Sequence, residues 1–481
     1  MGKFNESRAG TDKTVNKSGH AAYKMSDKEK LVTQVITSFF NEKKFYGDNT
    51  KDTIETIKNV VKKDPAFVAK LAVFARKEFH MRSVAHVLTA YLAHEPAGKP
   101  YVRETIKGVV ERGDDLTEIM AFYLATFGKP IPNSIKKGFN EKLLTFDEYT
   151  LAKYKGDSKS VKMRDLICLC RPKPQTQEQS DLFKRCIEDR LQTPMTWESE
   201  LSANGNNAET WEKLIESGKV GYMALLRNLR NIVTARPKNI DKVFRKIEDP
   251  EAVKRSKQLP FRFLSAYKSV LGCGSSRVYD ALEAAVEASM ENVEKIHGLT
   301  IVAIDVSGSM CHTISDKSEI TASEVAALIG LMASKLCEES IVYLFNTSLE
   351  KMAVSHRTGI LDACSNWRCG GGTNMSLPFL EIQRSDIKPD RVIIVSDNEV
   401  NTGGNLWYGI QPVEKLADDT RKKVGKDFWC HGIDLMGYGT QQFKGPKTNI
   451  IAGWSEKVLD FIGLAEEGAG NIVNRISGYE W

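Results

Sequence analysis

The amino-acid sequence predicts two unlike domains, a series of α-helices followed by an α/β domain with a doubly wound sheet. Amphipathic helical patterns fill the chain from Ser26 to about residue 297, with almost no strand-like alternation. Beyond that point, short β-branched apolar runs alternate with helical patterns, which is typical of parallel sheets. The length of 481 residues also exceeds that of one typical domain.

The first part of the chain contains helix-start signals. Residues 1–25 are polar and rich in Gly, Lys and Asn, without periodicity, and we expect a flexible arm. Ser26 and Glu29 form the pattern of a capping box at the start of the first helix. Asp64 and Pro65 are a suitable N-cap and first helical residue for a second helix.

Further short amphipathic segments follow, each ended by Gly, Pro or a polar loop. They include RSVAHVLTAYLAHE, YVRETIKGVVERG, DLTEIMAFYLATFG, YMALLRNLRNIV and PFRFLSAYKSVLG. Because each helix pair would cover the apolar face of its neighbour, residues 26–297 are predicted to form an α-solenoid.

Residues 298–481 show the alternation of strands and helices. The predicted buried strands are GLTIVAID, SIVYLFN, DRVIIVSD and DFWCHGID. The helical segments between and after them are SEVAALIGLMASKLCEE, PVEKLADDTRKKVG and SEKVLDFIGLAEEG. This order predicts an α/β doubly wound domain.

Composition narrows the class of protein. No apolar run approaches the ~20 residues of a membrane span, and MGKFNESRAG lacks the apolar core of a signal peptide. Nine cysteines without regular spacing predict reduced thiols, among them Cys168, Cys170, Cys364 and Cys369. We therefore expect a soluble cytoplasmic protein that contacts no membrane.

Charge is distributed unevenly along the chain. Residues 1–300 contain 51 Lys and Arg against 39 Asp and Glu, a surplus of 12 positive charges. Residues 301–481 contain 17 against 23, a deficit of six, and together they give the net charge of +6. This asymmetry predicts that the helical domain meets a polyanion and the α/β domain does not.

Acids and hydroxyls follow the predicted strands of the α/β domain. Asp305 ends one strand and Asp397 another, and ligands of α/β sheets bind at these carboxyl ends. The glycines of CGGGTNMS permit a tight loop that brings Thr373 close, and Ser307 and Ser309 add hydroxyls. Such hard oxygen atoms suit a divalent cation, Mg²⁺ or a similar ion. A serine-rich helix cap would explain DVSGS alone equally well.

Together, DVSGSM, GGGTN and VSDNE resemble the metal-ion-dependent adhesion site (MIDAS) of von Willebrand factor A domains, over about residues 298–481. The resemblance implies one set of metal ligands: Asp305, Ser307, Ser309, Thr373 and Asp397. It also implies one coordination position open to a water or to the acidic group of a partner.

Catalysis is not predicted. His312 is the histidine near the site in sequence, and no nucleophile–base pair accompanies it. A phosphoryl-transfer enzyme with an Asp nucleophile usually needs a second acid two residues on, where this chain has Ser307. A Ser/His/Asp assembly from distant residues stays open, but the pattern favours binding.

The densest basic run lies in residues 153–173. Its cations could neutralise several phosphates along one path; they are Lys153, Lys155, Lys159, Lys162, Arg164, Arg171 and Lys173. A solvated helix face is the alternative, and charge alone fits RNA, DNA or an anionic membrane.

The motifs LAKYK, VKMRDLICLCRPKP, TWESELS and GKVGYMALLRNLRNI, followed by the A domain, resemble the TROVE-domain Ro ribonucleoproteins. The resemblance implies a ring of HEAT-like helical repeats closed by the A domain. It implies that Y or Y-like small non-coding RNA binds the basic run on the outer surface. Single-stranded ends of misfolded structured RNA would enter a central hole, for RNA quality control. An exoribonuclease or another protein is a further partner that we consider.

Two details of this resemblance concern single residues. Ro proteins often have His before Pro or Leu where this chain has Arg171, so we expect a phosphate contact there rather than a base contact. Lys77, His80, Arg82 and His86 are candidates to line the hole, although the histidines fit packed helix positions equally well. The rival functions are a metal-dependent protein-interaction scaffold without RNA function, and a nuclease.

Overall fold

The computed structural model describes residues 13–16, 19–37, 51–192, 196–273, 276–291, 293–314, 318–355, 357–365, 367–401, 413–425, 427–468 and 472–480. The chain divides into two compact units. The α/β unit comprises Met1–Thr37, Leu259–Lys268 and Val286–Asn471, and the helical unit comprises Ser38–Gln258, Ser269–Ala285 and Ile472–Trp481.

The helical unit is built of short helices. They are α2 (Lys51–Lys63), α3 (Pro65–Lys77), α4 (Ser83–His94), η4 (Pro96–Tyr101), α5 (Val102–Val109), α6 (Gly113–Phe127), α7 (Asn133–Leu143), α8 (Glu148–Lys153), α9 (Met163–Cys170), α10 (Gln177–Ile187), α11 (Trp197–Asn204), α12 (Ala208–Glu216), α13 (Tyr222–Arg227), α14 (Leu229–Ala235), α15 (Ile240–Glu248), α16 (Pro250–Ser256) and α24 (Ile472–Ser477). Helices α17 (Pro260–Val270) and α18 (Ser276–Ala288) contribute residues to both units.

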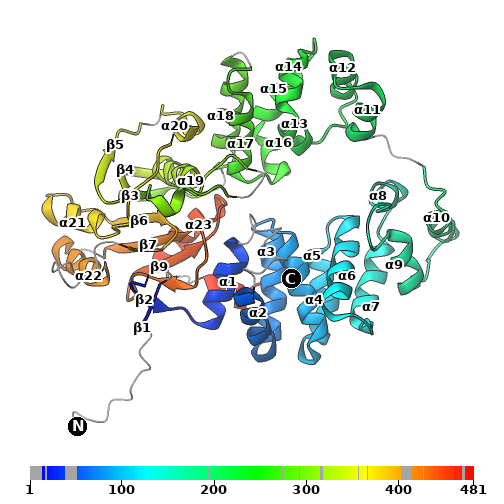
Figure 1. Cartoon of the computed structure of the whole chain (residues 1–481), viewed down its shortest axis with the longest axis horizontal. Helices are drawn as coiled ribbons and strands as arrows, with labels where there is room; N and C mark the ends of the chain where they lie inside the picture. The colour runs from blue at the N-terminus through cyan, green and yellow to red at the C-terminus, as the bar shows by residue number, and fades with distance from the viewer. Residues whose placement is uncertain are drawn as a thin grey trace, which may run out of the picture. The chain divides into compact units, whose positions relative to one another are not determined.

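Helices in this unit pack mainly on near neighbours in sequence. Helix α3 contacts α4 and α5, α5 contacts α7, and α9 contacts α6, α7 and α10 (Figure 1). Helices α12 to α16 pack in the same way. This is the arrangement of a solenoid, in which each helix pair buries the apolar face of the next. The predicted α-solenoid is therefore confirmed.

A six-stranded mixed sheet forms the centre of the α/β unit, in the order β5-β4-β3-β6-β7-β9. Its parallel strands are β3 (Ile296–Asp305), β4 (Cys337–Phe345), β6 (Arg391–Ser396), β7 (Trp429–Asp434) and β9 (Thr448–Ala452). Strand β5 (Leu349–Met352) pairs antiparallel with β4 at the edge. The four predicted strands are confirmed, and β5 and β9 extend the sheet at its two ends.

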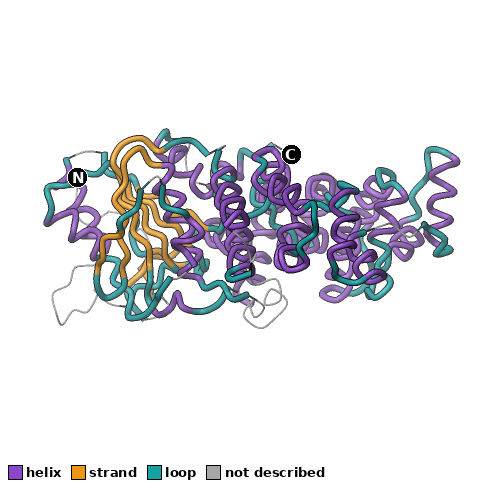
Figure 2. The backbone as a smooth tube through the Cα atoms, turned by 90° about the horizontal axis from the view of Figure 1, so that it is seen from above, coloured by secondary structure: helices purple, strands orange, loops and turns teal. Residues whose placement is uncertain are grey.

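Helices cover both faces of this sheet (Figure 2). The unit contains α1 (Asp27–Thr37), η5 (Gly308–Cys311), α19 (Ala322–Leu336), α20 (Ile360–Ser365), α21 (Leu377–Arg384), α22 (Val413–Val424) and α23 (Lys457–Glu466). On one face, Ile301 and Ala303 of β3 belong to the same buried cluster as Phe379 and Leu416. On the other face Gly330 of α19 approaches Ile304 of β3. Alternate residues of β3 thus serve two apolar layers, as a doubly wound sheet requires.

The two predicted N-caps are present. The Ser26 backbone N–H donates to Glu29 Oε2 over 2.8 Å, and the Glu29 N–H donates to Ser26 Oγ over 3.3 Å. Asp64 Oδ1 accepts from the Phe67 N–H at 3.0 Å, ahead of Pro65. In the described ranges, no helix combines the length and apolar character needed to cross a bilayer.

The two ends of the chain do not follow the predicted domain boundaries at residues 25 and 297. Within the predicted arm, β1 (Lys13–Val15) and β2 (Ala21–Lys24) form a small sheet with β8 (Thr440–Gln441), and residues 1–12 lie outside the described residues. Helix α1 packs on β9 of the α/β unit, whereas α24 packs on α3 of the helical unit. Helices α1 and α24 therefore belong to the opposite units from those predicted, and the strands of the predicted arm belong to the α/β unit.

Candidate cation site and basic surface

The carboxyl ends of β3 and β6 bring the two predicted acids together, because these strands are parallel neighbours. The Ser307 N–H donates to Asp305 Oδ1 at 2.8 Å, and Ser396 Oγ donates to Asp305 Oδ2 at 2.6 Å. Ser307 Oγ and Ser309 Oγ lie 3.1 Å apart. Asp397 lies one residue beyond β6, and its Oδ1 accepts from the Glu399 N–H at 3.0 Å.

Thr373 reaches this site from a separate loop. Its N–H donates to Asn401 Oδ1 at 2.6 Å, and its carbonyl accepts from the Asn401 N–H at 3.2 Å. Its side chain is fully buried, and Oγ1 has no hydrogen-bond partner within the described residues. A buried hydroxyl without a partner is costly, so a ligand for this oxygen would stabilise the loop.

Buried negative charge is concentrated here. Burial, and then the charge of Asp397, raise the pKa of Asp305 to about 7, and burial also raises the pKa of Asp397. At the end of β7, burial likewise raises the pKa of Asp434 to about 7, with Asp397 and Glu399 contributing. Carboxylates removed from water beside one another are stabilised either by a bound positive charge or by taking up a proton.

The donor chemistry fits a divalent cation of the Mg²⁺ type, because it consists of oxygen atoms alone. The described part of the chain contains no group of three or more His, Cys, Asp or Glu placed to hold a metal. The predicted ligand set has two carboxylates and otherwise hydroxyls, so it stays a prediction. Asp305, Asp397 and the three hydroxyl residues would hold the ion and leave room for an outside ligand.

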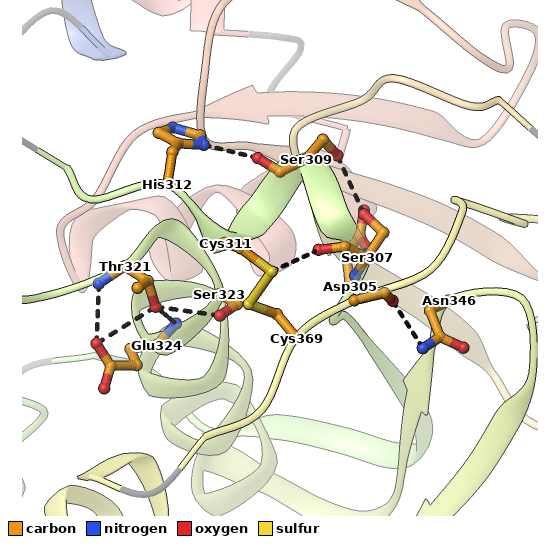
Figure 3. The surroundings of a disulfide bond; sticks show 11 residues. Asp305, Ser307, Ser309, Cys311, His312, Thr321, Ser323, Glu324, Asn346 and Cys369 are labelled. Atoms are coloured by element: carbon orange, nitrogen blue, oxygen red, sulfur yellow. Dashed lines mark hydrogen bonds between the residues drawn. A yellow bond between two sulfur atoms is a disulfide. The ribbon is translucent and has the colours of Figure 1, made fainter.

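The structure corrects the prediction that all cysteines are thiols. Cys311, at the end of η5, and Cys369 form a disulfide with a Cα–Cα distance of 5.6 Å (Figure 3). The prediction is wrong for these two cysteines because 58 residues separate them, and only the folded loops bring them together. The other seven cysteines, including Cys168, Cys170 and Cys364, are free.

Three supporting residues were not predicted. Ser396 hydrogen-bonds Asp305, Asn401 holds the backbone of Thr373, and Asp434 adds a third buried acid at the sheet edge. Their positions in the sequence could have identified them. Each lies near the end of a predicted strand or contacts a predicted ligand.

The predicted basic residues lie on the surface of the helical unit, from the end of α8 to the loop after α9. Lys153, Lys159, Arg164, Arg171 and Lys173 are exposed. Lys153 Nζ lies 5.4 Å from the ring centroid of Tyr149 and 5.6 Å from that of Tyr154. Arg171 ends α9 in the left-handed conformation and extends into solvent.

Acids pair with part of this basic run. Lys155 lies 2.7 Å from Asp157 and 3.5 Å from Asp189, and Lys159 lies 3.3 Å from Glu118. Across the described residues, no such ion pair involves Lys153, Lys162, Arg171 or Lys173. These four cations, which we call the open basic surface, are the ones least compensated by the protein itself.

Arg82 and His86 are held by acids of α6. Arg82 donates to Asp115 Oδ1 at 2.6 Å and pairs with Asp114 at 2.7 Å. His86 is only 2% exposed, its Nε2 lies 3.1 Å from Asp115 Oδ1, and burial lowers its pKa. His86 is therefore a packed helix residue in this structure, which is the alternative to its predicted place in a hole.

The fold and sites together define a class of protein, a helical-repeat domain combined with a von Willebrand A-like α/β domain. A model of the TROVE domain matches residues 22–190 and 184–273, more than half of the chain, and a model of the Ro60 vWA domain matches residues 300–419. The chain belongs to the TROVE-domain Ro ribonucleoprotein family.

Individual relatives match shorter stretches. RNA-binding protein RO60 of Deinococcus radiodurans is 25% identical over 271 residues, 52% of this chain and 49% of the relative. Telomerase protein component 1 of Rattus norvegicus is 26% identical over 292 residues, 43% of this chain and 11% of the relative. The chain thus spans from about a tenth to about half of the length of these relatives.

A solved structure shares the fold. The crystal structure of the Deinococcus radiodurans RO (RSR) protein superimposes with a TM-score of 0.63 at 18% identity, covering 91% of this chain and 100% of that one. At this identity the likeness concerns the fold alone.

Proposed function

We propose that this protein binds RNA and is not an enzyme. The observation on which the proposal rests is the open basic surface of Lys153, Lys162, Arg171 and Lys173 within the TROVE domain. Cations without carboxylate partners are free to neutralise phosphates. Relatives named RNA-binding protein RO60 in Deinococcus radiodurans and Caenorhabditis elegans support the same assignment.

The finer proposal concerns the RNA. A small Y or Y-like non-coding RNA would lie along the open basic surface, and single-stranded ends of misfolded structured RNA would be a second ligand in RNA quality control. Phosphate contacts favour any RNA backbone, and exposed Tyr149 beside Lys153 offers a face on which an unpaired base can stack.

We also propose that Asp305, Ser307, Ser309, Thr373 and Asp397 bind one divalent cation, Mg²⁺ in the cell. The unpaired buried Oγ1 of Thr373 and the raised pKa of Asp305 support this proposal. When bound, the ion would supply a coordination position for an acidic group of a partner. A crystal soaked in Mn²⁺ without an anomalous peak between Asp305 and Asp397 would contradict it.

The RNA proposal is tested with the variant Lys162→Gln/Arg171→Gln/Lys173→Gln and a stem–loop RNA that has a single-stranded 3′ extension. We expect weaker binding and a flatter dependence of log K on log salt. The slope should fall by about 0.7 to 0.9 for each phosphate that the variant no longer neutralises. Fluorescence anisotropy at several salt concentrations measures both quantities.

The matched control removes the same charge from exposed lysines of the α/β unit, in Lys351→Gln/Lys388→Gln/Lys422→Gln. Its affinity and slope should equal those of the wild type. Equal decreases in the two variants would mean that only net charge matters. Absence of RNA binding by the wild type, with cation binding intact, would favour the interaction scaffold instead.

A further inference from the structure

The disulfide joins two of the three chain segments that contain the predicted cation ligands. Cys311 follows Ser307 and Ser309 by a few residues, and Cys369 precedes the glycine loop that leads to Thr373. Figure 3 shows the bond beside Asp305 and Ser307. Cys311 Sγ also lies 3.8 Å from the Ser307 carbonyl oxygen, so the sulfur contacts the ligand loop itself.

Apart from this bond, the two segments are held together by hydrogen bonds between backbones. The Gly308 N–H donates to the Gly371 carbonyl and the Gly370 N–H to the Val306 carbonyl, both at 2.8 Å. Glycine residues lose much conformational freedom when a loop is ordered. A covalent link at Cys369 therefore restricts the segment that presents Thr373 more firmly than the hydrogen bonds alone.

The two sulfurs differ from most other cysteines in accessibility. Cys311 and Cys369 are half-buried, whereas Cys170, Cys186, Cys337, Cys364 and Cys430 are buried. A surface cavity of about 430 Å³ is lined by Trp367, Cys369 and Gly370, among other residues. A small thiol entering this cavity would meet Cys369, one of the two cysteines of the disulfide.

We propose that Cys311 and Cys369 form a redox modification site that sets the affinity of the cation site. The proposal rests on the cation binding proposed above. The disulfide form holds the loop of Thr373 in place for the ion, and the dithiol form releases it. Because the released loop must be ordered again on binding, the dithiol form binds the cation more weakly, about three- to tenfold.

The chemistry is thiol–disulfide exchange with a small dithiol. One thiolate of the dithiol attacks a sulfur of the Cys311–Cys369 bond and forms a mixed disulfide, and its second thiolate displaces the protein sulfur. Two electrons and two protons pass to the protein cysteines, and the dithiol becomes a cyclic disulfide. A low-molecular-weight disulfide reverses the reaction.

The test uses the full-length protein before and after dithiothreitol treatment, with the reductant removed. Alkylation under denaturing conditions should label seven cysteines before reduction, the number of free thiols, and all nine afterwards. Titration with Mn²⁺ alone by calorimetry should show a Kd about three- to tenfold higher after reduction. Cys311→Ser/Cys369→Ser should bind like the reduced protein under both conditions, and Cys168→Ser should respond like the wild type.

Each outcome decides a different point. Nine labelled cysteines before reduction, or equal Mn²⁺ affinity in the two forms, would overturn the redox inference and leave the cation site in place. If neither form binds Mn²⁺, the proposed cation site fails and the inference fails with it. Comparison of wild type with and without reductant remains decisive if the double serine variant does not fold.

Discussion

Asp115 is the centre of a buried ionic cluster in the helical unit. It accepts from Arg76 at 3.2 Å and from Arg82 at 2.6 Å, and His86 lies 3.1 Å away. Burial alone would raise the pKa of Asp115, but His86, Arg82 and Arg76 outweigh it and lower the pKa. The cluster links α3, α4 and α6, so Arg82 and His86 stabilise the solenoid from within.

His80, between α3 and α4, predicts a pH dependence of stability. Burial, and then the charge of Lys257, lower its pKa to about 4, while Arg76 lowers it further and Glu111 and Glu78 oppose the shift. Between pH 6.5 and 4 the unfolded chain binds a proton that the folded chain excludes, so stability falls as pH falls. We expect His80 to contribute roughly 1 to 2 kcal/mol to the decrease in stability between pH 7 and 5.

The variant His80→Asn tests this, because asparagine does not titrate and tolerates the φ of 55° at this position. Urea unfolding should show that the change from pH 7 to pH 5 is less destabilising for the variant than for the wild type. The lowered pKa of His86 and His431 acts in the same direction as that of His80, whereas the raised pKa of Asp305 and Asp434 acts in the opposite direction in both proteins. An equal change in variant and wild type would contradict the prediction.

Single residues differ in how far the sequence predicts them. Asp305 and Asp397 are predictable as neighbours because both follow apolar strand patterns, and carboxyl ends of parallel strands meet at one sheet edge. The Cys311–Cys369 pair is not, since it depends on how two loops fold. The burial of the His86 side chain is not predictable from the sequence either, because a helical pattern does not identify which polar residue contacts a buried acid.

At the scale of elements, the packing of α5 on α3 depends on a glycine. A Cβ added to Gly108 would lie 2.7 Å from both Cγ atoms of Val73 and 3.3 Å from its Cβ. Valine is stiff at χ1 and cannot turn away without strain. The close approach of these two helices therefore requires a residue without a side chain.

Gly108→Ala should lower the stability of the helical unit by about 1 to 3 kcal/mol, because overpacking exceeds the gain in helix propensity. The control is Gly463→Ala in α23, where nothing lies within 4 Å of the added Cβ. That substitution should stabilise the protein by up to about 1 kcal/mol. Chemical denaturation measures both; stabilisation by Gly108→Ala would show that the helices can move apart freely.

The sequence predicts an element as helix or strand where its hydrophobic pattern is clear over the whole element. The β-branched runs of β3 and β6 and the capping box of α1 are local patterns of this kind. Strands β1 and β2 are short, and their sheet is completed by the distant β8, which pairs with β2. Pairing between segments far apart in sequence leaves no local pattern.

On the scale of the whole molecule, each end of the chain belongs to the unit that is built mainly from the other half of the sequence. Near the C-terminus the Tyr479 ring lies 5.2 Å from that of Phe74, and its hydroxyl donates to Glu78 at 2.9 Å, all within the helical unit. Near the N-terminus, Asn16 Nδ2 donates to the Val400 carbonyl of the α/β unit at 2.9 Å. Local patterns locate helices and strands but not the unit on which a terminal segment packs.

The charges and the predicted cation ligands lie in different parts of the sequence. The surplus of positive charge lies before residue 300, and the cation ligands all lie after it. A charge at Asp305 and Asp397 is screened within ~10 Å at moderate salt, so it should have little effect on RNA bound to the open basic surface. We therefore expect cation binding and RNA binding to be separable.

The variant Asp305→Asn/Asp397→Asn keeps the shape of both side chains and removes their charge. Without Mg²⁺ it should be at least as stable as the wild type, because it relieves the burial and repulsion that raise the pKa of Asp305. Added Mg²⁺ should raise the melting temperature of the wild type and not that of the variant. RNA affinity should stay within about twofold, because the cations of the open basic surface belong to the other unit. A large decrease in RNA affinity in a variant whose circular dichroism melt is intact would mean that the cation site itself contacts RNA, and the two functions would then share one surface.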